Sequence, residues 1–373
     1  MRVALAIGDF SPQKGGAERS VAEIAEDFLR SGHEVHVFSY RFGDSMGEKI
    51  RRHRIPVIPF PKSLRLLSFA LLASRAMRRG GFDLTISVGE TWGADILQSR
   101  GGVHWSWFWK SLQTYRNPLS RGVKLLGRLL SPRQWAQGLI ETIAYKRAKR
   151  IIAISEMVKE DIVRYYKIPP DRIEVNYTKV DTERFHPRNR RWRAEVRTRY
   201  GIPQDAFLIL FSSHNFRMKG LRYLIETLSI LKDSGKDCYL LVLGRDDPGP
   251  YLRLARRLGC EERVRFAGGV KDPERYYGAA DLLVHPTFYD ACSRVVLEAL
   301  SSGLPVITTR SNGAGWIIKD KKGGIVLEIP FDAYKLSQRI QLFFDAGTWE
   351  RAKATARSVV LERYERRGGH FPP

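Results

Sequence analysis

The feature that most constrains the fold is a regular alternation of short apolar, strand-like runs with longer helix-like segments. A helix that follows a strand returns the chain to the same edge of the sheet, so the strands run parallel. The expected strands of the first half are Val3–Ile7, Glu34–Ser39, Phe82–Val88 and Arg150–Ile154, and the first expected helix spans Ala17–Leu29. The pattern predicts an α/β fold with a doubly wound parallel sheet.

The alternation stops near residue 170 and then starts again. Pro169 and Pro170, the irregular segment 176–187 and the arginine-rich segment 188–199 are typical of a linker or an interdomain crossing. The expected strands beyond it are Phe207–Phe211, Tyr239–Leu243, Val264–Phe266, Leu282–His285 and Val306–Thr308. A chain of 373 residues is long enough for two cores. We therefore expect two Rossmann-like domains, residues 1–170 and 171–345, that face a cleft, because ligands of such sheets sit at the carboxyl ends of the strands.

The charge of the chain is strongly positive. Sixty-three Lys and Arg residues against forty Asp and Glu residues give a net charge of +23. This balance favours anionic partners such as nucleic acid, acidic lipid or phosphorylated substrates, and the alternative is general solubility. Helix-turn-helix, zinc-finger and RNA-binding motifs are missing from the sequence, so we expect no nucleic-acid partner.

The start of the chain and its cysteines bear on its location. The opening segment, MRVALAIGDF, lacks the pattern of a signal peptide, and the longest apolar run, 66–73, is too short to cross a bilayer. Cys238, Cys260 and Cys292 are scattered, which fits a reducing compartment. We therefore expect a cytoplasmic protein, or one that lies on a membrane without crossing it.

Two loops have residues suited to phosphate. Gly15 and Gly16 follow the first strand and open a helix, where close backbone approach and the helix dipole favour an anion. Arg217 and Lys219 follow the first strand of the second half and could neutralise a diphosphate. Taken alone, the first pair could be an ordinary structural turn and the second a solvated basic loop.

A third segment, residues 285–305, carries two acids separated by seven residues. Asp290 and Glu298 span a loop and the start of a helix, so loop amides lie between them. Carboxylates accept hydrogen bonds in pairs, and Asp290 could serve sugar hydroxyls while Glu298 serves ribose hydroxyls. A glutamate on an otherwise apolar helix face is costly to bury without a partner. Asp246 and Asp247 are better explained by a solvated turn than by a metal site, and the histidines show no ligand spacing.

These segments together resemble glycosyltransferase family 4, whose members are retaining enzymes of the GT-B fold. The likeness rests on the paired acids with Leu297–Leu300 and Gly303–Ile307, and on four further segments in family order: 15–19, 180–187, 217–220 and 280–283. Within the family the chain is most similar to bacterial lipopolysaccharide core glucosyltransferases. This implies a hexosyltransferase that needs no metal or other cofactor, with UDP-glucose as substrate.

The resemblance also implies roles for single residues. The first domain would bind the acceptor, the second the nucleotide-sugar, and a helix within residues 346–373 would cross back to the first domain. His104, Asp290, Arg217 and Lys219 would be catalytic, although His104 beside an aromatic cluster could be merely structural. The donor would bind to Gly15, Gly16, Arg217, Lys219, Val270, Ala291, Cys292, Ser293 and Glu298.

The sequence departs from the family at the first acidic position, which is usually Glu and is Asp290 here. The shorter carboxylate leaves the identity of the donor sugar open. Other activities on the same architecture, a sugar phosphorylase or a nucleotide-sugar epimerase, also remain open.

Residues 105–150 combine positive charge with apolar side chains. They contain ten Lys or Arg residues, four tryptophans and a single acid, Glu141. Basic segments with Trp and Leu bind the headgroups of anionic bilayers, and the alternative is a basic helix packed on the sheet. We therefore expect an enzyme on the inner face of a bacterial cytoplasmic membrane, with Lys124, Arg128 and Arg133 facing the lipid and a lipopolysaccharide or other lipid-linked glycan as acceptor.

Overall fold

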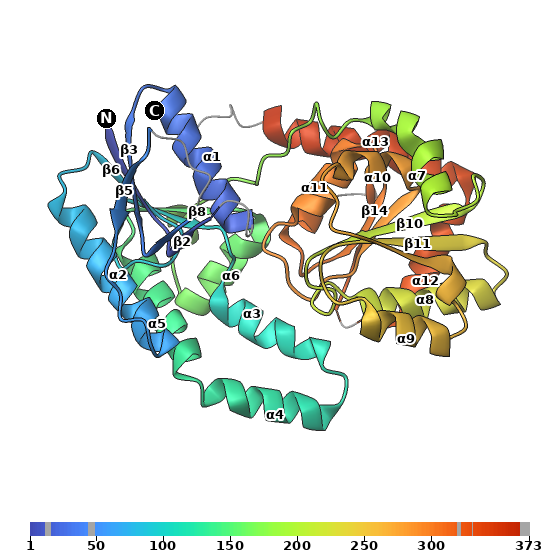
Figure 1. Ribbon diagram of the computed structural model, residues 1–373, viewed down its shortest axis with the longest axis horizontal. Coiled ribbons are helices and arrows are strands. Elements are labelled where there is room, and N and C mark those ends of the chain that lie inside the picture. The colour runs from blue at the N-terminus through green and yellow to red at the C-terminus, as the bar shows by residue number, and fades with distance from the viewer. Residues whose placement is uncertain (12–15, 44–48, 319–321, 330, 366–373) are drawn as a thin grey trace. The chain divides into compact units, whose positions relative to one another are not determined.

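The computed structural model describes residues 1–11, 16–43, 49–318, 322–329 and 331–365 (Figure 1). The chain forms two compact units, Met1–Tyr177 and a second unit that starts at Thr178. This boundary lies a few residues beyond the expected position 170, because the short strand β9 (Ile173–Val175) pairs with β8 (Arg150–Ala153) of the first unit.

The first unit is built on a parallel sheet with the strand order β5-β3-β1-β6-β7-β8-β9 among its described residues. The central strands are β1 (Arg2–Ala6) and β6 (Leu84–Ser87). The others are β3 (Glu34–Ser39), β5 (Arg51–Arg54), β7 (Ile96–Ser99), β8 and β9, and a separate ladder pairs β2 (Asp9–Phe10) with β4 (Arg41–Phe42). The chain moves outward from β1 in one direction and then restarts at β6 in the other, which creates a topological switch point between these two strands.

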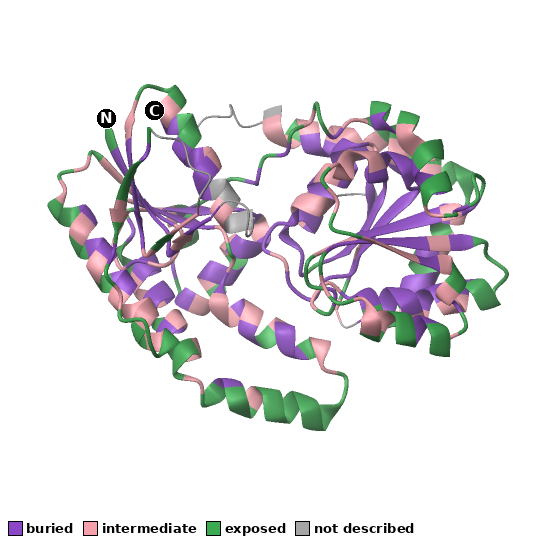
Figure 2. Cartoon of the chain, in the orientation of Figure 1, coloured by how far each residue is buried: buried purple, intermediate pink, exposed green. Residues whose placement is uncertain are grey.

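Helices cover this sheet and extend from it. They are α1 (Gly16–Arg30), α2 (Lys62–Arg79), α3 (His104–Lys110), α4 (Pro118–Leu129), α5 (Pro132–Arg147) and α6 (Glu156–Tyr166). The α6 helix starts where the Ser155 side chain accepts a hydrogen bond from the Val158 amide at 3.2 Å, a standard N-cap. The α4 helix is exposed along most of its length, as Figure 2 shows.

The second unit repeats the same topology. Its parallel sheet has the order β12-β11-β10-β13-β14-β15 within the described part of the chain. The strands are β10 (Phe207–Ser212), β11 (Cys238–Leu243), β12 (Val264–Gly268), β13 (Leu282–His285), β14 (Val306–Thr309) and β15 (Gly324–Leu327). This is the order of a Rossmann sheet, with its switch point between β10 and β13.

The helices of the second unit enclose a fully buried core. They are α7 (Arg193–Arg199), α8 (Leu221–Asp233), α9 (Gly249–Arg257), α10 (Pro273–Ala279), α11 (Arg294–Ser301), α12 (Ala333–Gln341) and α13 (Ala346–Glu365). Phe211, Leu240 and Leu228 are completely buried in this core. Strands buried on both faces explain why the sequence shows continuous apolar runs here rather than alternation.

The expected strands are largely confirmed. Glu34–Ser39 and Leu282–His285 have the predicted bounds, and the others differ by one or two residues at an end. The predicted strands do not include β5, β7, β9 and β15 of the two sheets. The sequence missed β5 because an edge strand that reads Arg-Arg-His-Arg carries no apolar signal.

The arginine-rich segment 188–199 is not a linker, and that prediction was wrong. It forms a 3-10 helix, Pro187–Trp192, and α7, which both pack against α10 of the second unit. The guanidinium of Arg197 is fully buried and lies 2.7 Å from the Asp281 carboxylate, and Arg193 lies 2.8 Å from the same group. These two arginines therefore anchor the segment to a buried acid.

The last helix, α13, packs against α11 of its own unit. The Tyr364 hydroxyl accepts a hydrogen bond from the Val180 amide and donates one to the Thr178 carbonyl, which ties the helix to the first residues of the unit. Its crossing to the first unit stays a prediction. In the described residues, no helix is both long and apolar enough to span a bilayer.

Candidate functional site

The second unit gathers most of the predicted site residues at one edge of its sheet. Arg217 and Lys219 follow the central strand β10, and Asp290 follows its neighbour β13. Val270 follows the edge strand β12 and is partly exposed. Because the strands are parallel, all these loops lie at the carboxyl edge, and those of Lys219 and Asp290 flank the switch point, where ligands of such sheets bind.

Lys219 and Asp290 form an ion pair across the switch point. The Lys219 ammonium donates to Asp290 Oδ2 at 2.7 Å and to the Tyr289 carbonyl at 2.8 Å. His285 Nε2 lies 3.6 Å from the same Asp290 oxygen. Burial would raise the pKa of the Asp290 carboxyl, but the positive Lys219 and the hydrogen bond from His285 outweigh it and hold that pKa well below its usual range. Asp290 is therefore an anion that can accept hydrogen bonds at neutral pH.

The loop that carries Arg217 and Lys219 is held by backbone contacts. Gly220 has a φ of +78°, and a Cβ there would lie 2.4 Å from the Pro286 carbonyl oxygen, so this position requires glycine. The Phe288 amide donates to the Met218 carbonyl at 3.0 Å, and the Phe216 amide donates to Asp246 at 2.8 Å. Asp246 thus orders the loop rather than lying in a simple solvated turn, which corrects the sequence interpretation. Arg217 itself is exposed.

The segment between the two acids starts α11. Ala291, Cys292 and Ser293 are buried, and the Ser293 amide donates to Asn312 Oδ1 at 3.2 Å. The Ser293 amide is therefore already hydrogen-bonded within the unit, so the predicted donor-binding role of Ser293 does not depend on this amide. Glu298 lies on the first turns of α11, half-buried, and accepts a hydrogen bond from the Tyr277 hydroxyl at 2.9 Å. Glu298 thus has the partner that a buried glutamate requires.

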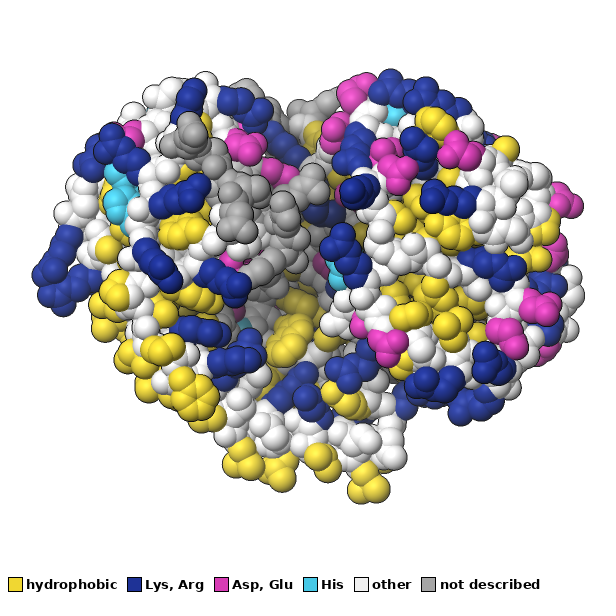
Figure 3. Space-filling model, viewed as in Figure 1, with side chains coloured by type: hydrophobic (Ala, Val, Ile, Leu, Met, Phe, Trp, Pro, Cys, Tyr) yellow, Lys and Arg dark blue, Asp and Glu magenta, His cyan; other side chains and the backbone are white. Residues whose placement is uncertain are grey.

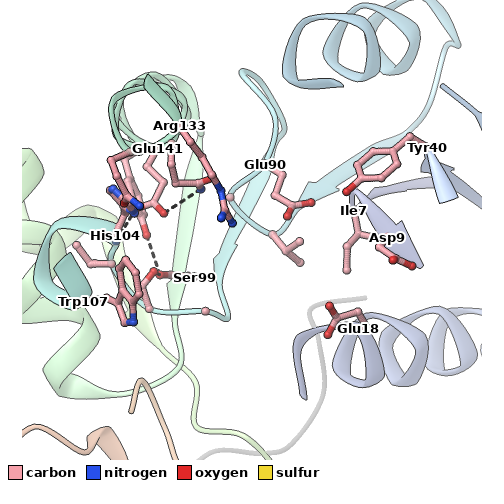
Figure 4. A pocket seen from close by; sticks show the side chains of 18 residues that line it. Ile7, Asp9, Glu18, Tyr40, Glu90, Ser99, His104, Trp107, Arg133 and Glu141 are labelled. Atoms are coloured by element: carbon pink, nitrogen blue, oxygen red, sulfur yellow. Dashed lines mark hydrogen bonds between the residues drawn. The ribbon is translucent and has the colours of Figure 1, made fainter. Parts of the chain in front are cut away.

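The first unit contains a cavity of about 500 Å³ at the carboxyl ends of β1, β3, β6 and β7. This volume suits a small-molecule ligand. Its labelled side chains form two facing walls in Figure 4: Asp9, Glu18, Tyr40 and Glu90 on one side, and His104, Trp107, Arg133 and Glu141 on the other. The Gly8 amide donates to Glu90, which joins the loops after β1 and β6 across the switch point of this sheet.

His104 is the first residue of α3 and lines this cavity. Its ring donates to the Gln134 carbonyl, and its Nε2 atom is buried with no partner among the described residues. Burial lowers the pKa of His104 to about 4, with smaller contributions from Arg128 and Arg133. The hydrogen bond to Gln134 acts in the opposite direction but is outweighed. The imidazole is therefore neutral, and Nε2 is a buried acceptor that no described residue uses.

Glu141 supports His104 and was missed as a site residue. Its carboxylate accepts hydrogen bonds from the His104 amide at 3.0 Å and the Tyr166 hydroxyl at 2.7 Å. Burial raises the pKa of Glu141 to about 7, although these hydrogen bonds lower it. The sequence did contain a signal for this residue, because Glu141 is the single acid in the basic segment 105–150.

The predicted glycine pair is only partly described. Gly15 lies outside the described residues, and Gly16 is the first residue of α1. In the described part of the chain, no three His, Cys, Asp or Glu side chains gather as metal ligands would.

Comparison with known proteins identifies the family. The model described as Glycosyltransferase Family 4 matches residues 14–184, and the model described as Glycosyl transferases group 1 matches residues 193–358. A probable transglycosylase of Burkholderia thailandensis is 30% identical over 301 residues, which cover 80% of this chain and 75% of that protein. The chain belongs to glycosyltransferase family 4. The predicted family and enzyme class are confirmed, and this family 4 protein is a retaining glycosyltransferase.

Two further relatives are informative. The lipopolysaccharide glucosyltransferase WaaG of Escherichia coli K12 is 25% identical to the family 4 protein over 327 residues, covering 87% of this chain and 84% of WaaG. A crystal structure of WaaG has a TM-score of 0.78 at 22% identity, over 98% of this chain and 100% of that one. Anabaena HepE in complex with UDP-glucose has a TM-score of 0.68 at 17% identity, over 98% and 95%. The predicted GT-B fold, with two parallel sheets, is confirmed.

Proposed function

We propose that this family 4 enzyme transfers glucose from UDP-glucose to a lipopolysaccharide core or another lipid-linked glycan. The observation that carries the proposal is the Lys219–Asp290 ion pair at the switch point of the second sheet. It places a cation suited to a diphosphate beside an anion suited to sugar hydroxyls. WaaG is named a lipopolysaccharide glucosyltransferase, and HepE, which has a similar fold, was solved in complex with UDP-glucose. Both support the choice of donor.

Each predicted residue has a task in the transfer. Arg217 and Lys219 stabilise the negative charge that develops on the departing diphosphate, and Glu298 accepts from the ribose hydroxyls. Asp290 accepts from hydroxyls of the donor sugar, whereas Val270, Ala291, Cys292, Ser293 and the glycines Gly15 and Gly16 line the donor. His104 Nε2 accepts from a donor-sugar hydroxyl, because its ring is neutral and this nitrogen has no partner among the described residues.

A donor assay tests this proposal. The enzyme is incubated with UDP-glucose, UDP-galactose, GDP-mannose or ADP-glucose, and release of nucleoside diphosphate is measured with and without a membrane fraction that supplies acceptors. We expect acceptor-dependent release of UDP from UDP-glucose, undiminished by chelator. A requirement for an added divalent metal contradicts the metal-free mechanism. Interconversion of UDP-glucose and UDP-galactose favours an epimerase. Release of sugar 1-phosphate from glycans of the membrane fraction, when inorganic phosphate is added and the nucleotide-sugar is left out, favours a phosphorylase.

We further propose that the first unit docks on an anionic membrane through α4, which places the enzyme on the inner face of the cytoplasmic membrane. Four apolar side chains of this helix and its C-cap are more than half exposed: Leu119, Val123, Leu126 and Leu130. They recur at helical spacing and follow the outer edge of α4 as a row of hydrophobic side chains in Figure 3. Arg121 and Lys124 are exposed on the same helix, so apolar and basic groups can meet an anionic bilayer together.

Arg128 does not face the lipid, and its assignment to the membrane surface was wrong. It is the one buried residue of α4, with its guanidinium 4.8 Å from the centre of the Trp107 ring. It also donates to the Phe108 carbonyl. Arg128 therefore connects α4 to α3, and its charged group interacts with residues inside the first unit.

A further inference from the structure

Tyr277 connects the sheet of the second unit to Glu298. It lies on α10, is only 2% exposed, and its hydroxyl donates to Glu298 Oε2 at 2.9 Å. The Phe185 ring packs edge-to-face against it, with the ring centres 5.7 Å apart. The phenol ring therefore cannot swing away from Glu298 without disturbing the core of the unit.

The Tyr277 hydroxyl is itself oriented. It is hydrogen-bonded to the side chain of Ser212, the last residue of β10. Burial and the negative charge of Glu298 hold the pKa of Tyr277 well above its usual value, so the phenol stays protonated and keeps donating. A chain of hydrogen bonds thus runs from the carboxyl end of the central strand, through α10, to the carboxylate on α11.

A glutamate side chain has three rotatable bonds, and a ligand that binds it must fix them unless the protein has already done so. The Tyr277 hydroxyl holds one carboxylate oxygen in place before any ligand arrives. We propose that Tyr277 is a positioning residue that orients Glu298 toward the ribose hydroxyls of the donor nucleotide. This inference rests on the proposed function, in which Glu298 binds the ribose.

The chain provides a matched control at the adjacent position. Tyr276 lies on the same helix and is 3% exposed, but its hydroxyl lies 3.1 Å from the Tyr200 hydroxyl instead. Tyr276→Phe and Tyr277→Phe therefore each remove one buried hydroxyl from α10. Only the second removes the hydrogen bond to Glu298.

The test compares binding of UDP and 2′-deoxy-UDP to wild type, Tyr277→Phe, Tyr276→Phe and Glu298→Gln by isothermal titration calorimetry. We expect wild type to prefer UDP and Tyr277→Phe to bind UDP about tenfold more weakly, the effect of one charged hydrogen bond. The loss should be smaller for 2′-deoxy-UDP, which keeps only the 3′ hydroxyl. Tyr276→Phe should keep both affinities. For UDP-glucose turnover, KM should rise in Tyr277→Phe more than kcat falls.

The possible results distinguish failure of the inference about Tyr277 from failure of the proposed ribose contact of Glu298. Equal weakening of UDP and 2′-deoxy-UDP by Tyr277→Phe makes Tyr277 structural only and overturns the inference. Unchanged UDP binding in Glu298→Gln, or no UDP binding by wild type, removes the proposed ribose contact and the inference with it. If Tyr277→Phe does not fold, Ser212→Ala replaces it, since the phenol remains but loses its orientation. An unchanged ratio of the two affinities in that variant also overturns the inference.

Discussion

The Lys219 ammonium lies 2.7 Å from the Asp290 carboxylate, so an ion pair joins the loops that follow β10 and β13. Both side chains are about one-fifth exposed, at 18% and 20%, which leaves the pair accessible from solvent but weakly screened. A ligand at this edge of the sheet therefore meets a fixed cation and a fixed anion side by side.

Asp290→Asn should lower transfer strongly, and Asp290→Glu should lower it less. Asparagine cannot pair with Lys219 as an ion, whereas glutamate restores the charge and is the residue usual in the family at this position. A charged hydrogen bond of roughly 1.5–3 kcal/mol corresponds to a ten- to hundredfold loss of kcat/KM for asparagine. Steady-state kinetics with UDP-glucose check this, and equal activity of both variants would show that the charge at position 290 is unimportant.

Arg217→Ala and Lys219→Ala should each weaken transfer and the binding of free UDP by roughly ten- to a hundredfold. The physical reason is the loss of a cation from the diphosphate site. Arg222→Ala is the control, because Arg222 lies on α8 and pairs with Glu226 at 3.0 Å. If the control loses as much UDP affinity as the other two, the effect is general charge and the specific assignment fails.

Glu141 and His104 should give opposite pH dependences of stability. The pKa of Glu141 is raised to about 7, so the folded state binds more protons than the unfolded state between pH 4.5 and 7 and loses stability as pH rises. The pKa of His104 is lowered to about 4, so the folded state binds fewer protons between pH 4 and 6.5 and gains stability as pH rises.

Thermal unfolding of two variants separates these contributions. Relative to wild type, Glu141→Gln should become progressively more stable as pH rises from 4.5 to 7. His104→Asn should become progressively less stable, relative to wild type, from pH 4 to 6.5. Differences from wild type cancel the other titrating groups, and a pH-independent difference for either variant would contradict the burial argument for that residue.

Arg197→Met should destabilise the second unit by about 3–5 kcal/mol, because it removes the fully buried partner of Asp281. The matched control is Arg263→Gln, which breaks a 2.8 Å pair between a partly exposed arginine and the exposed Asp237. A surface pair of this kind contributes less than about 1 kcal/mol. Chemical denaturation measures both, and similar losses for the two variants would mean that burial of Arg197 does not decide its contribution.

Replacing Leu119, Val123 and Leu126 with Ser should lower binding to anionic vesicles by on the order of a hundredfold, from the apolar surface that no longer enters the bilayer. Leu342→Ser is the control, since Leu342 is also exposed, at 43%, but lies in the second unit. Arg121→Gln with Lys124→Gln should weaken binding to anionic vesicles only, and less so at high salt. Co-sedimentation that is unchanged in the Leu119, Val123 and Leu126 variant would place the membrane contact elsewhere or nowhere.

Local sequence pattern was sufficient to predict two parallel sheets, although not every strand in them. Buried parallel strands such as β10 and β13 need continuous apolar runs, and the helices between them need one apolar face, so both leave a signal in consecutive residues. The acids Asp290 and Glu298 were recognisable for the same reason, because a loop and the helix after it are contiguous in the chain.

The contacts that determine the chemistry of Asp290 and Glu298 could not be predicted from local sequence pattern. Lys219 and Asp290 are 71 positions apart, and Tyr277 and Glu298 are 21 apart, so their pairing depends on strand order and helix packing. Arg128 and Arg197 have the composition of surface residues, and only the folded chain shows that both are buried against partners. The sequence by itself indicated most of the segments that become strands and helices, since periodicity is a local property. The tertiary structure alone decided which charges are paired, buried or neutral, because burial and distance between remote residues set their energies.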